Sequence, residues 1–313
     1  MSYKAKIGKY IKSPWKLFRV LGYRGFFKSI PDEKYLKILY KTELGKTLDL
    51  DNPKTFNEKL QWLKLYYRGD DFTNKVDKIE VRKYIEDKLG KEYLIPMLGI
   101  YDSVEEINWD ELPNKFVLKC THGSHCNIIC KDKDSLDIEK AKKKLTKWME
   151  KSWYWFGREW PYKNIKPRII CEEFIVDEKL SDLPDYKFMC FNGKPKLVMV
   201  CQDRNEHAVS INSFYDMNWN ITEIKQGPLN VRTDEAKLLN KPKNYEKMIE
   251  FSKVLSEGLP FSRIDFYEVN GKLLFGEITF FTWSGLGKFT PEKYDEILGS
   301  WIELPKDVAI GER

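Results

Sequence analysis

Residues 262–281 read SRIDFYEVNGKLLFGEITFF, and the rest of the chain is organised around this stretch. Two runs rich in β-branched and aromatic residues flank Asn270-Gly271, which is the strongest short signal for a two-residue hairpin turn. The stretch is therefore predicted to be a β-hairpin. Its unusual feature is a set of charged residues in strands whose other residues suit a hydrophobic core.

Those charged residues are Arg263 and Asp265 on the first strand and Glu277 on the second, with Thr279 two residues further on. Two acids on paired strands can share a hard cation such as Mg²⁺, which prefers oxygen ligands. The ordinary alternative is an Arg263–Glu277 ion pair on a solvated sheet face, because such pairs are common between neighbouring strands. Spacing alone leaves both interpretations open.

The hairpin geometry makes the metal hypothesis testable. A plain two-residue loop places Asp265 opposite Gly276 and turns Glu277 to the other side, because strand side chains alternate between faces. A three-residue loop with a glycine bulge instead places Arg263 opposite Glu277, with Asp265 diagonal to it on the same face. The metal hypothesis therefore predicts a bulge in this hairpin.

Length and composition are those of an ordinary globular protein. The chain has 313 residues, of which 42% are hydrophobic and 33% charged, so it can form two or three lobes or one large domain. No apolar run approaches the roughly 20 residues needed to span a bilayer. No cleavable signal peptide is apparent, so the expected compartment is the cytoplasm.

The positive charge is concentrated at the N-terminus. Residues 1–31 carry eight basic residues and no acidic one, and the remaining chain is slightly acidic. Apolar residues fall there at helical spacing, namely Ile7, Ile11, Trp15, Phe18 and Leu21. A basic helix of this kind can lie on an anionic membrane, on the inner face if the protein is cytoplasmic, or pack on the protein body with its lysines in water. Nucleic acid is not expected as a partner, because the body lacks a matching basic groove.

The pattern of elements indicates an α+β protein. Helices are predicted at 32–44, 55–67, 75–89 and 137–151, and Thr55-x-x-Glu58 has the form of a capping box. Strands are predicted at 116–120, 128–131 and 168–175, with a second hairpin at 185–203 turned at Asn192-Gly193. This order of strand, loop, strand, helix and strand suits a small lobe that covers a ligand.

Three further groups of polar residues point to a nucleotide. Lys119 ends a strand and precedes a loop with Gly123 and Ser124, which suits phosphate oxygens although it is much weaker than a P-loop. Glu172 and Glu173 interrupt an apolar strand, where a carboxylate and free backbone groups can contact adenine and ribose. The third group comprises Asp185 and Lys187 at the start of one strand and Arg204 after its partner.

Two other motifs suggest different chemistry. Asp132-Lys133-Asp134 has the DxD form with which glycosyltransferases hold a metal-bound nucleotide sugar, but no doubly wound nucleotide domain precedes it. A cluster of cysteines and histidines lies nearby, but its spacing matches no usual structural zinc site; its members are Cys120, His122, His125, Cys126 and Cys130. A non-catalytic nucleotide-binding module at the membrane is a further alternative.

Several stretches together resemble the ATP-grasp group typified by the teichuronopeptide-biosynthesis protein TupA. They are PKTFNEKLQWLKLY, FVLKCTHGSHCNIICKDK, PRIICEEF, LPDYKFMCFNGKPK, RIDFY and FGEITFF, and the resemblance extends over about residues 54–305. The resemblance implies an ATP-grasp fold, in which two α+β lobes clasp ATP. The expected divisions are a helical extension at 1–70, the start of the core at 71–113, a small lid lobe at 114–180, a large lobe with the metal site at 181–305, and a tail at 306–313.

The resemblance also implies a role for each matched residue. ATP phosphates would be contacted by Lys78 and Lys119 and covered by the loop through Gly123 and Ser124. The adenine hinge would comprise Glu172, Glu173, Phe174 and Ile175, with Asp185 and Lys187 also at the nucleotide. Arg204 and Arg263 would stabilise the transferring phosphoryl group. Mg²⁺ would be held by Asp265, Glu277 and Thr279.

The implied activity is that of an ATP-dependent carboxylate–amine ligase acting through an acyl phosphate, in the biosynthesis of a cell-surface polysaccharide. The sequence departs from the broader pattern at two positions. His125 stands where a second loop glycine is expected, and Thr279 stands where other ATP-grasp enzymes carry an asparagine metal ligand. His122 is the one candidate near the site for proton transfer, and a role in stabilising the loop is an equal alternative.

Overall fold

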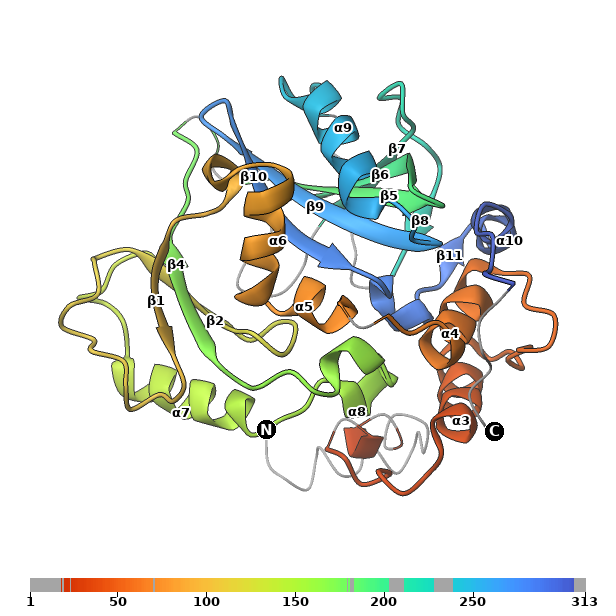
Figure 1. The fold of residues 1–313 in the computed structure, drawn as a ribbon, viewed down its shortest axis with the longest axis horizontal. Coiled ribbons are helices and arrows are strands. Elements are labelled where there is room, and N and C mark those ends of the chain that lie inside the picture. Colours follow the sequence, from red (N-terminus) through yellow and green to blue (C-terminus); the bar gives the residue numbers. More distant parts are fainter. Residues whose placement is uncertain are drawn as a thin grey trace.

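The computed structural model of the chain describes residues 18, 20–22, 24–69, 71–178, 180, 183–202, 211–227 and 239–306. Most of the basic N-terminal segment and Arg204 lie outside these residues. Two antiparallel sheets form the body, a smaller one at the left of Figure 1 and a larger one above and to the right of it. Within the described ranges, no helix has both the length and the apolar character that a membrane span requires.

The smaller sheet has the strand order β1-β4-β2-β3. Leu118, Cys171 and Leu145 belong to its core, and Leu145 comes from the amphipathic helix α7 that packs on the sheet. The predicted strands and helix of this region are confirmed to within two residues at each end. The bounds of these elements are Phe116–Cys120 (β2), Asn127–Cys130 (β3), Ile138–Met149 (α7) and Ile169–Glu173 (β4), and the sheet also contains Met97–Tyr101 (β1).

The larger sheet has the order β10-β9-β5-β6-β7, and helix α9 covers one of its faces (Figure 1). Phe188 of β5 contacts Tyr245 of α9 and Phe266 of β9, so this face is filled by aromatic rings. The alternate residues Lys187 and Asp265 therefore face the other way. The bounds are Asp185–Phe191 (β5), Lys194–Gln202 (β6), Ile211–Tyr215 (β7), Tyr245–Ser256 (α9), Phe261–Val269 (β9) and Lys272–Thr279 (β10).

The β9–β10 hairpin contains the predicted bulge, but at a different place. The loop is the plain two-residue turn Asn270-Gly271, with φ values of 49° and 79°, so the bulge does not come from a three-residue loop. Regular pairing runs as far as Phe275↔Phe266, and the register then shifts across Gly276 so that Glu277 pairs with Asp265. Arg263 pairs with Thr279 rather than with Glu277. The bulge brings both acids onto one face.

Helices from the N-terminal part pack beside the larger sheet (Figure 1). The capping box of α4 is confirmed, because Thr55 Oγ1 accepts from the backbone N–H of Glu58 while Glu58 Oε2 accepts from that of Thr55. Gly299 of α10 allows α10 to pack closely against the start of α4, since a Cβ on Gly299 would lie 2.2 Å from the Lys54 carbonyl oxygen. The bounds are Asp32–Leu44 (α3), Phe56–Tyr66 (α4) and Lys293–Ser300 (α10).

The prediction of a single continuous helix over 75–89 is wrong. Two helices occupy the region, α5 (Phe72–Val76) and α6 (Glu80–Lys88), and Asp77 separates them. Its carboxylate accepts from the backbone N–H groups of Ile79 and Glu80 and so offers the chain an alternative to a continuous helix. Lys78 consequently lies in the break between the helices. The remaining short elements are Lys91–Tyr93 (η1), Tyr154–Gly157 (α8), Trp160–Tyr162 (η2), Lys225–Gln226 (β8), Thr282–Gly285 (η3) and Phe289–Thr290 (β11).

Candidate active site

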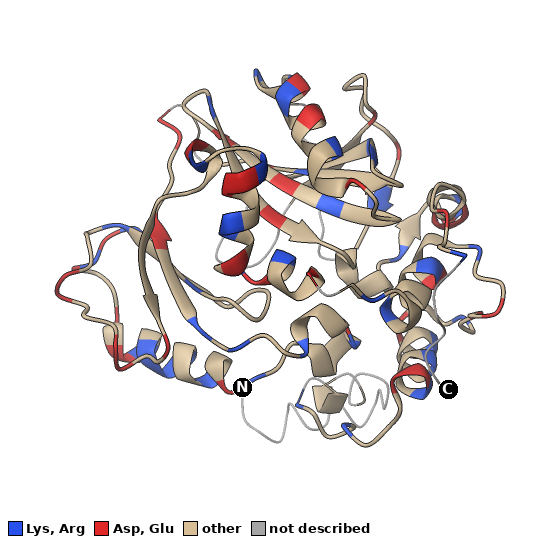
Figure 2. Cartoon of the chain, viewed as in Figure 1, with Lys and Arg blue, Asp and Glu red and all other residues tan. Residues whose placement is uncertain are grey.

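A buried cluster of charges lies on the face of the larger sheet opposite α9. Asp265 is at its centre, since its strand partners are Lys187 on β5 and Glu277 on β10. Asp265 is 1% exposed and Lys187 7% exposed. Figure 2 shows acidic and basic positions side by side on these central strands. Local alternation along β5, β9 and β10 thus gathers residues from three strands at one place.

Arg263 joins the two acids. Its Nε and Nη2 atoms each donate to one carboxylate oxygen of Asp265 at 2.7 Å, and Nη2 also donates to Glu277 Oε1 at 2.7 Å. Lys187 Nζ contacts Asp265 Oδ2 and lies 2.6 Å from Asp185 Oδ2. The Arg263–Glu277 ion pair is therefore present, and Arg263 and Asp265 are buried whereas Glu277 is partly exposed.

The two acids differ in proton affinity. Burial raises the pKa of Asp265 to about 6, although Arg263 and Lys187 oppose that shift. Glu277 has a side chain that is 46% exposed; its desolvation would raise its pKa, but Arg263, then Lys187 and Lys78, lower that pKa to about 2. Burial also acts to lower the pKa of Lys187, but Asp185 and Asp265 outweigh it and raise that pKa. The cluster therefore holds Glu277 ionised and Lys187 charged.

Two further lysines approach this cluster from other parts of the chain. Lys78, in the break between α5 and α6, donates to the Gly123 carbonyl at 2.7 Å. Lys119, near the end of β2, donates to Glu172 Oε2 at 2.6 Å. Both lysines interact electrostatically with Glu277 and with each other. Burial lowers the pKa of Lys78, whereas Glu172 offsets the burial of Lys119 and raises its pKa.

The predicted adenine hinge connects the two sheets. Glu172 accepts from Lys119 and also from Arg82 Nη1 at 3.0 Å, so its side chain is engaged within the protein. Beyond the exposed Glu173 the chain leaves β4, and the partly buried Phe174 and Ile175 lie on the way to β5. This connection contacts the hairpin turn, because the backbone N–H of Asn270 donates to Asp177 Oδ2 at 2.6 Å.

The donor set fits magnesium. Asp265 Oδ2 and Glu277 Oε1 both accept from the same Arg263 nitrogen, so both can converge on one cation. Thr279 is two residues from Glu277 on β10, which places its hydroxyl on the same face. In the described ranges, no group of three or more Asp, Glu, His or Cys side chains is arranged for a metal. Mg²⁺ usually keeps several waters and takes one or two carboxylates together with phosphate oxygens, which matches this pair.

Two residues of this region were missed at the sequence level, Lys64 of α4 and Glu159. Lys64 is 1% exposed and Glu159 is 5% exposed. Burial lowers the pKa of Lys64 to about 8 and raises that of Glu159, and each charge partly offsets the burial of the other. Glu159 also interacts electrostatically with Arg263. A signal existed, because Lys64 lies at helical spacing from the polar Asn57 and Gln61 on an otherwise apolar face.

The two histidines of the 121–126 loop have distinct environments. His122 is buried, its Nε2 atom lies 3.1 Å from the Trp148 carbonyl of α7, and burial lowers its pKa. This contact favours the loop-stabilising role for His122. His125 has a φ of 59°, a conformation that glycine adopts without steric cost. The loop therefore has the backbone shape of a glycine position at the residue where the sequence departs from the expected pattern.

The DxD sequence forms a surface turn. The Asp132 carboxylate accepts from the backbone N–H of Asp134 at 3.3 Å, and Lys133 Nζ donates to the carbonyls of Trp109, Asp110 and Leu112. Asp132 is thus used within its own turn. This geometry gives no support to the glycosyltransferase alternative.

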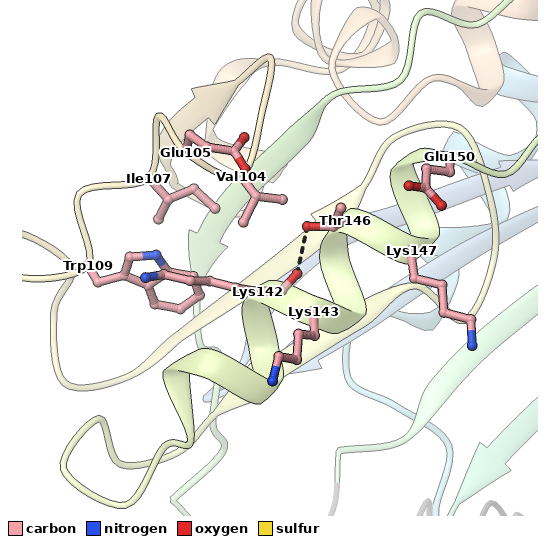
Figure 3. Close-up of a pocket in the computed structure, with 9 residues that line it drawn as sticks. All are labelled: Val104, Glu105, Ile107, Trp109, Lys142, Lys143, Thr146, Lys147 and Glu150. Carbon is pink, nitrogen blue, oxygen red and sulfur yellow. Dashed lines mark hydrogen bonds between the residues drawn. The ribbon is translucent and has the colours of Figure 1, made fainter.

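A cavity of about 600 Å³ lies elsewhere, between α7 and the segment 104–109 (Figure 3). Val104, Ile107 and Trp109 form its apolar side, and Lys142, Lys143 and Lys147 line it from α7. None of its lining residues belongs to the charge cluster around Asp265. This cavity is therefore separate from the candidate site.

Comparisons with known proteins agree with the motif resemblance. The profile of a family described as TupA-like ATPgrasp matches residues 58–303. No curated protein matches the chain.

Similar solved structures include a D-alanine–D-alanine ligase from Bacillus anthracis complexed with ATP (14% identity, 66% of this chain and 54% of that chain, TM-score 0.39). A D-alanine–D-alanine ligase from Helicobacter pylori (14%, 79% and 69%, 0.38) and an ATP-grasp RimK domain protein from Sphaerobacter thermophilus (11%, 74% and 69%, 0.40) are also similar. The chain spans about half the length of the first of these. Because the family profile matches most of the sequence, the chain belongs to the TupA-like ATPgrasp family, and its two-sheet α+β architecture is the ATP-grasp fold.

Proposed function

We propose that this protein is an ATP-dependent carboxylate–amine ligase. The observation that carries the proposal is the buried cluster in which Asp265 and Glu277 share Arg263. Lys78 and Lys119 interact electrostatically with Glu277 from outside the larger sheet. Two acids among several cations are what a site needs to hold a metal and to neutralise phosphate oxygens.

The nucleotide would lie between the two sheets. Lys78, Lys119 and Lys187 would bind its phosphates, and the loop through Gly123 and Ser124 would cover them. The hinge from Glu172 to Ile175, with Asp185, would bind adenine and ribose. Support comes from the Lys78–Gly123 contact, which already joins one of these lysines to the covering loop.

Asp265 and Glu277 would hold magnesium, with the Thr279 hydroxyl as an additional oxygen ligand. Bound there, Mg²⁺ would neutralise charge on the phosphate oxygens. Arg263 contacts these acids and would stabilise the transferring phosphoryl group together with Arg204. The low pKa of Glu277 supports this assignment, because an ionised carboxylate is the form that binds a cation.

The proposed reaction has two steps. An oxygen of the substrate carboxylate attacks the γ-phosphorus of ATP, the bond from that phosphorus to the β,γ-bridging oxygen breaks, and ADP leaves. The amine nitrogen then attacks the carbonyl carbon of the acyl phosphate, loses a proton, and expels inorganic phosphate to give an amide. Arg263 and the lysines neutralise charge on the phosphoryl oxygens, and no protein nucleophile is required.

The substrates that we propose come from cell-surface polysaccharide biosynthesis. The carboxylate would belong to a uronic acid and the amine to an amino acid. Family membership supports this context, and the cationic site is compatible with an anionic donor. A screen of uronic acids and amino acids for ATP-dependent phosphate release tests the assignment directly.

Asp265→Asn and Glu277→Gln test the role of the acid pair. At saturating MgATP each should lower the rate of phosphate release by roughly 100-fold or more, because it removes electrostatic stabilisation at the reacting phosphate. Glu268→Gln is the matched control, since Glu268 lies on the same strand but accepts hydrogen bonds from Asn244 instead. Its rate should stay close to that of the wild type. Undiminished phosphate release in both site variants, or release of UDP or another nucleotide from a nucleotide sugar, would refute the ligase.

A further inference from the structure

The stretch PKTFNEKLQWLKLY is used nowhere in the proposed chemistry, although it is one of the stretches that resemble the family. In the structure it forms α4, and three polar residues lie along one face of this helix, namely Asn57, Gln61 and Lys64. Each is at most 1% exposed. A buried polar stripe of this kind needs partners, because unpaired polar groups are costly in a protein interior.

All three side chains contact the loop 282–287, which directly follows β10. Asn57 Nδ2 donates to the Gly287 carbonyl at 3.0 Å, and Gln61 Nε2 donates to those of Ser284 and Gly285 at 3.0 and 2.7 Å. Lys64 Nζ donates to both the carbonyl and the hydroxyl of Ser284, at 2.8 and 2.9 Å. It also donates to the Gly157 carbonyl at 2.8 Å, two residues before Glu159.

The loop that α4 holds has a strained backbone. Trp283, Ser284 and Gly285 have φ values of 50°, 55° and 58°, and two of these left-handed residues are not glycine. Non-glycine residues in this region persist where the surrounding structure over-determines them. The hydrogen bonds from Gln61 and Lys64 end on this same segment.

The loop in turn contacts Arg263. Thr282 Oγ1 accepts from Arg263 Nη1 at 3.1 Å, and Thr282 is 1% exposed. Arg263 bridges Asp265 and Glu277 through its other nitrogens. Hydrogen bonds from α4 to the loop and the bond from Arg263 to Thr282 therefore link α4 to the guanidinium through the backbone of the loop.

We propose that α4 is a positioning element of the active site, in which Asn57, Gln61 and Lys64 hold the loop 282–287 in its left-handed conformation and thereby fix Thr282 against Arg263. These residues would act through the loop, which their side chains contact. The inference rests on the proposed function, because the reaction is where the position of Arg263 matters. Apolar residues at these positions would pack the helix with a smaller desolvation penalty, so packing alone does not account for the polar stripe.

Lys64→Met tests the proposal, because it keeps an unbranched side chain and removes the donor. Gln61→Leu is a second variant for the case in which Lys64→Met fails to fold, because it removes a donor to the loop without changing the charge. Lys59→Met is the matched control on the same helix, since Lys59 Nζ also donates to a backbone carbonyl, that of Ile302 at 2.7 Å, away from the loop. Each variant is compared with the wild type by hydrogen exchange of the 282–287 amides and by kcat and KM for ATP in phosphate release.

Lys64→Met and Gln61→Leu should each speed exchange of the 282–287 amides by about tenfold or more. They should lower kcat by about tenfold or more while KM for ATP stays within about twofold, because misplacement of a positioned group affects the reaction step. Lys59→Met should alter neither quantity. Unchanged exchange in the loop, or faster exchange with an unchanged kcat, would overturn the proposal, as would an equal fall in kcat for Lys59→Met.

The exchange and kinetic measurements distinguish failure of the positioning role from failure of the proposed function. If the wild-type protein releases no phosphate from ATP with any acid and amine, the ligase assignment fails. The exchange measurement needs no substrate, so it still decides whether α4 holds the loop. Unaltered exchange in both loop-contact variants would then refute the positioning role on its own.

Discussion

Gly276 is the residue on which the shared face of Asp265 and Glu277 depends. Asn270 and Gly271 satisfy the two left-handed positions of a tight turn, so the loop stays at two residues and the bulge has to lie further along the strand. The sequence predicted that a bulge was required but not where it would lie. Glycine lacks the Cβ that would crowd the opposite strand, and this is what a bulge at that position needs.

Gly276→Ala should damage the site. A Cβ at this position would lie 3.0 Å from the Asp265 carbonyl oxygen and 3.3 Å from Asp265 Cβ, so β9 or β10 must shift. We expect a loss of about 1–2 kcal/mol of unfolding free energy, which is typical of overpacking. Affinity for MgATP should fall by about tenfold, since displacement of Asp265 alters the cation site. Urea denaturation and calorimetric titration measure the two effects.

Ser262→Ala is the control for that experiment. Ser262 is fully buried on β9 and its hydroxyl has no hydrogen-bond partner among the residues that the structure describes, so removal of the hydroxyl should leave both stability and MgATP affinity near their wild-type values. If Gly276→Ala bound MgATP as tightly as Ser262→Ala, the bulge would have no part in the site.

At the scale of elements, local signals were read correctly where the determining groups are close in sequence. The capping box of α4 and the Asn-Gly turns are of this kind. The prediction of a continuous helix over 75–89 failed because the Asp77 carboxylate accepts from the backbone N–H groups of Ile79 and Glu80 and so interrupts the helix. Periodicity shows which residues of α4 share a face, but it does not show that Ser284, 220 residues beyond Lys64, lies against that face.

Thr55→Ala tests how much the capping box contributes to α4. Loss of the hydroxyl leaves the Glu58 N–H without its acceptor, and we expect about 1 kcal/mol of destabilisation. Thr55→Ser retains the acceptor and should lose much less. Urea denaturation of the two variants at constant pH measures the difference, and equal stability of the alanine and serine variants would show that the cap is not used.

At the scale of the whole molecule, motif resemblance predicted the ATP-grasp architecture, whereas the pairing of each lysine could not be predicted. Lys119 pairs with Glu172 and Lys78 with Gly123, because buried cations take the nearest acceptor that burial leaves them. These pairs also connect the two halves. Val76 and Val81 on either side of Lys78 belong to the core of the larger sheet, whereas Gly123 lies between two strands of the smaller sheet.

Lys78→Met should therefore loosen the covering loop before any nucleotide binds. Removal of the donor frees the Gly123 carbonyl, and we expect the amides of residues 121–127 to exchange about tenfold faster in the absence of ATP. Lys133→Met is the control, because Lys133 Nζ binds three carbonyls within the smaller lobe, including that of Leu112. It should speed exchange around 109–112 and leave residues 121–127 unchanged. Faster exchange at 121–127 in both variants would mean that the loop responds to general loosening of the smaller lobe. Unchanged exchange at 121–127 in Lys78→Met would show that Lys78 does not hold the loop.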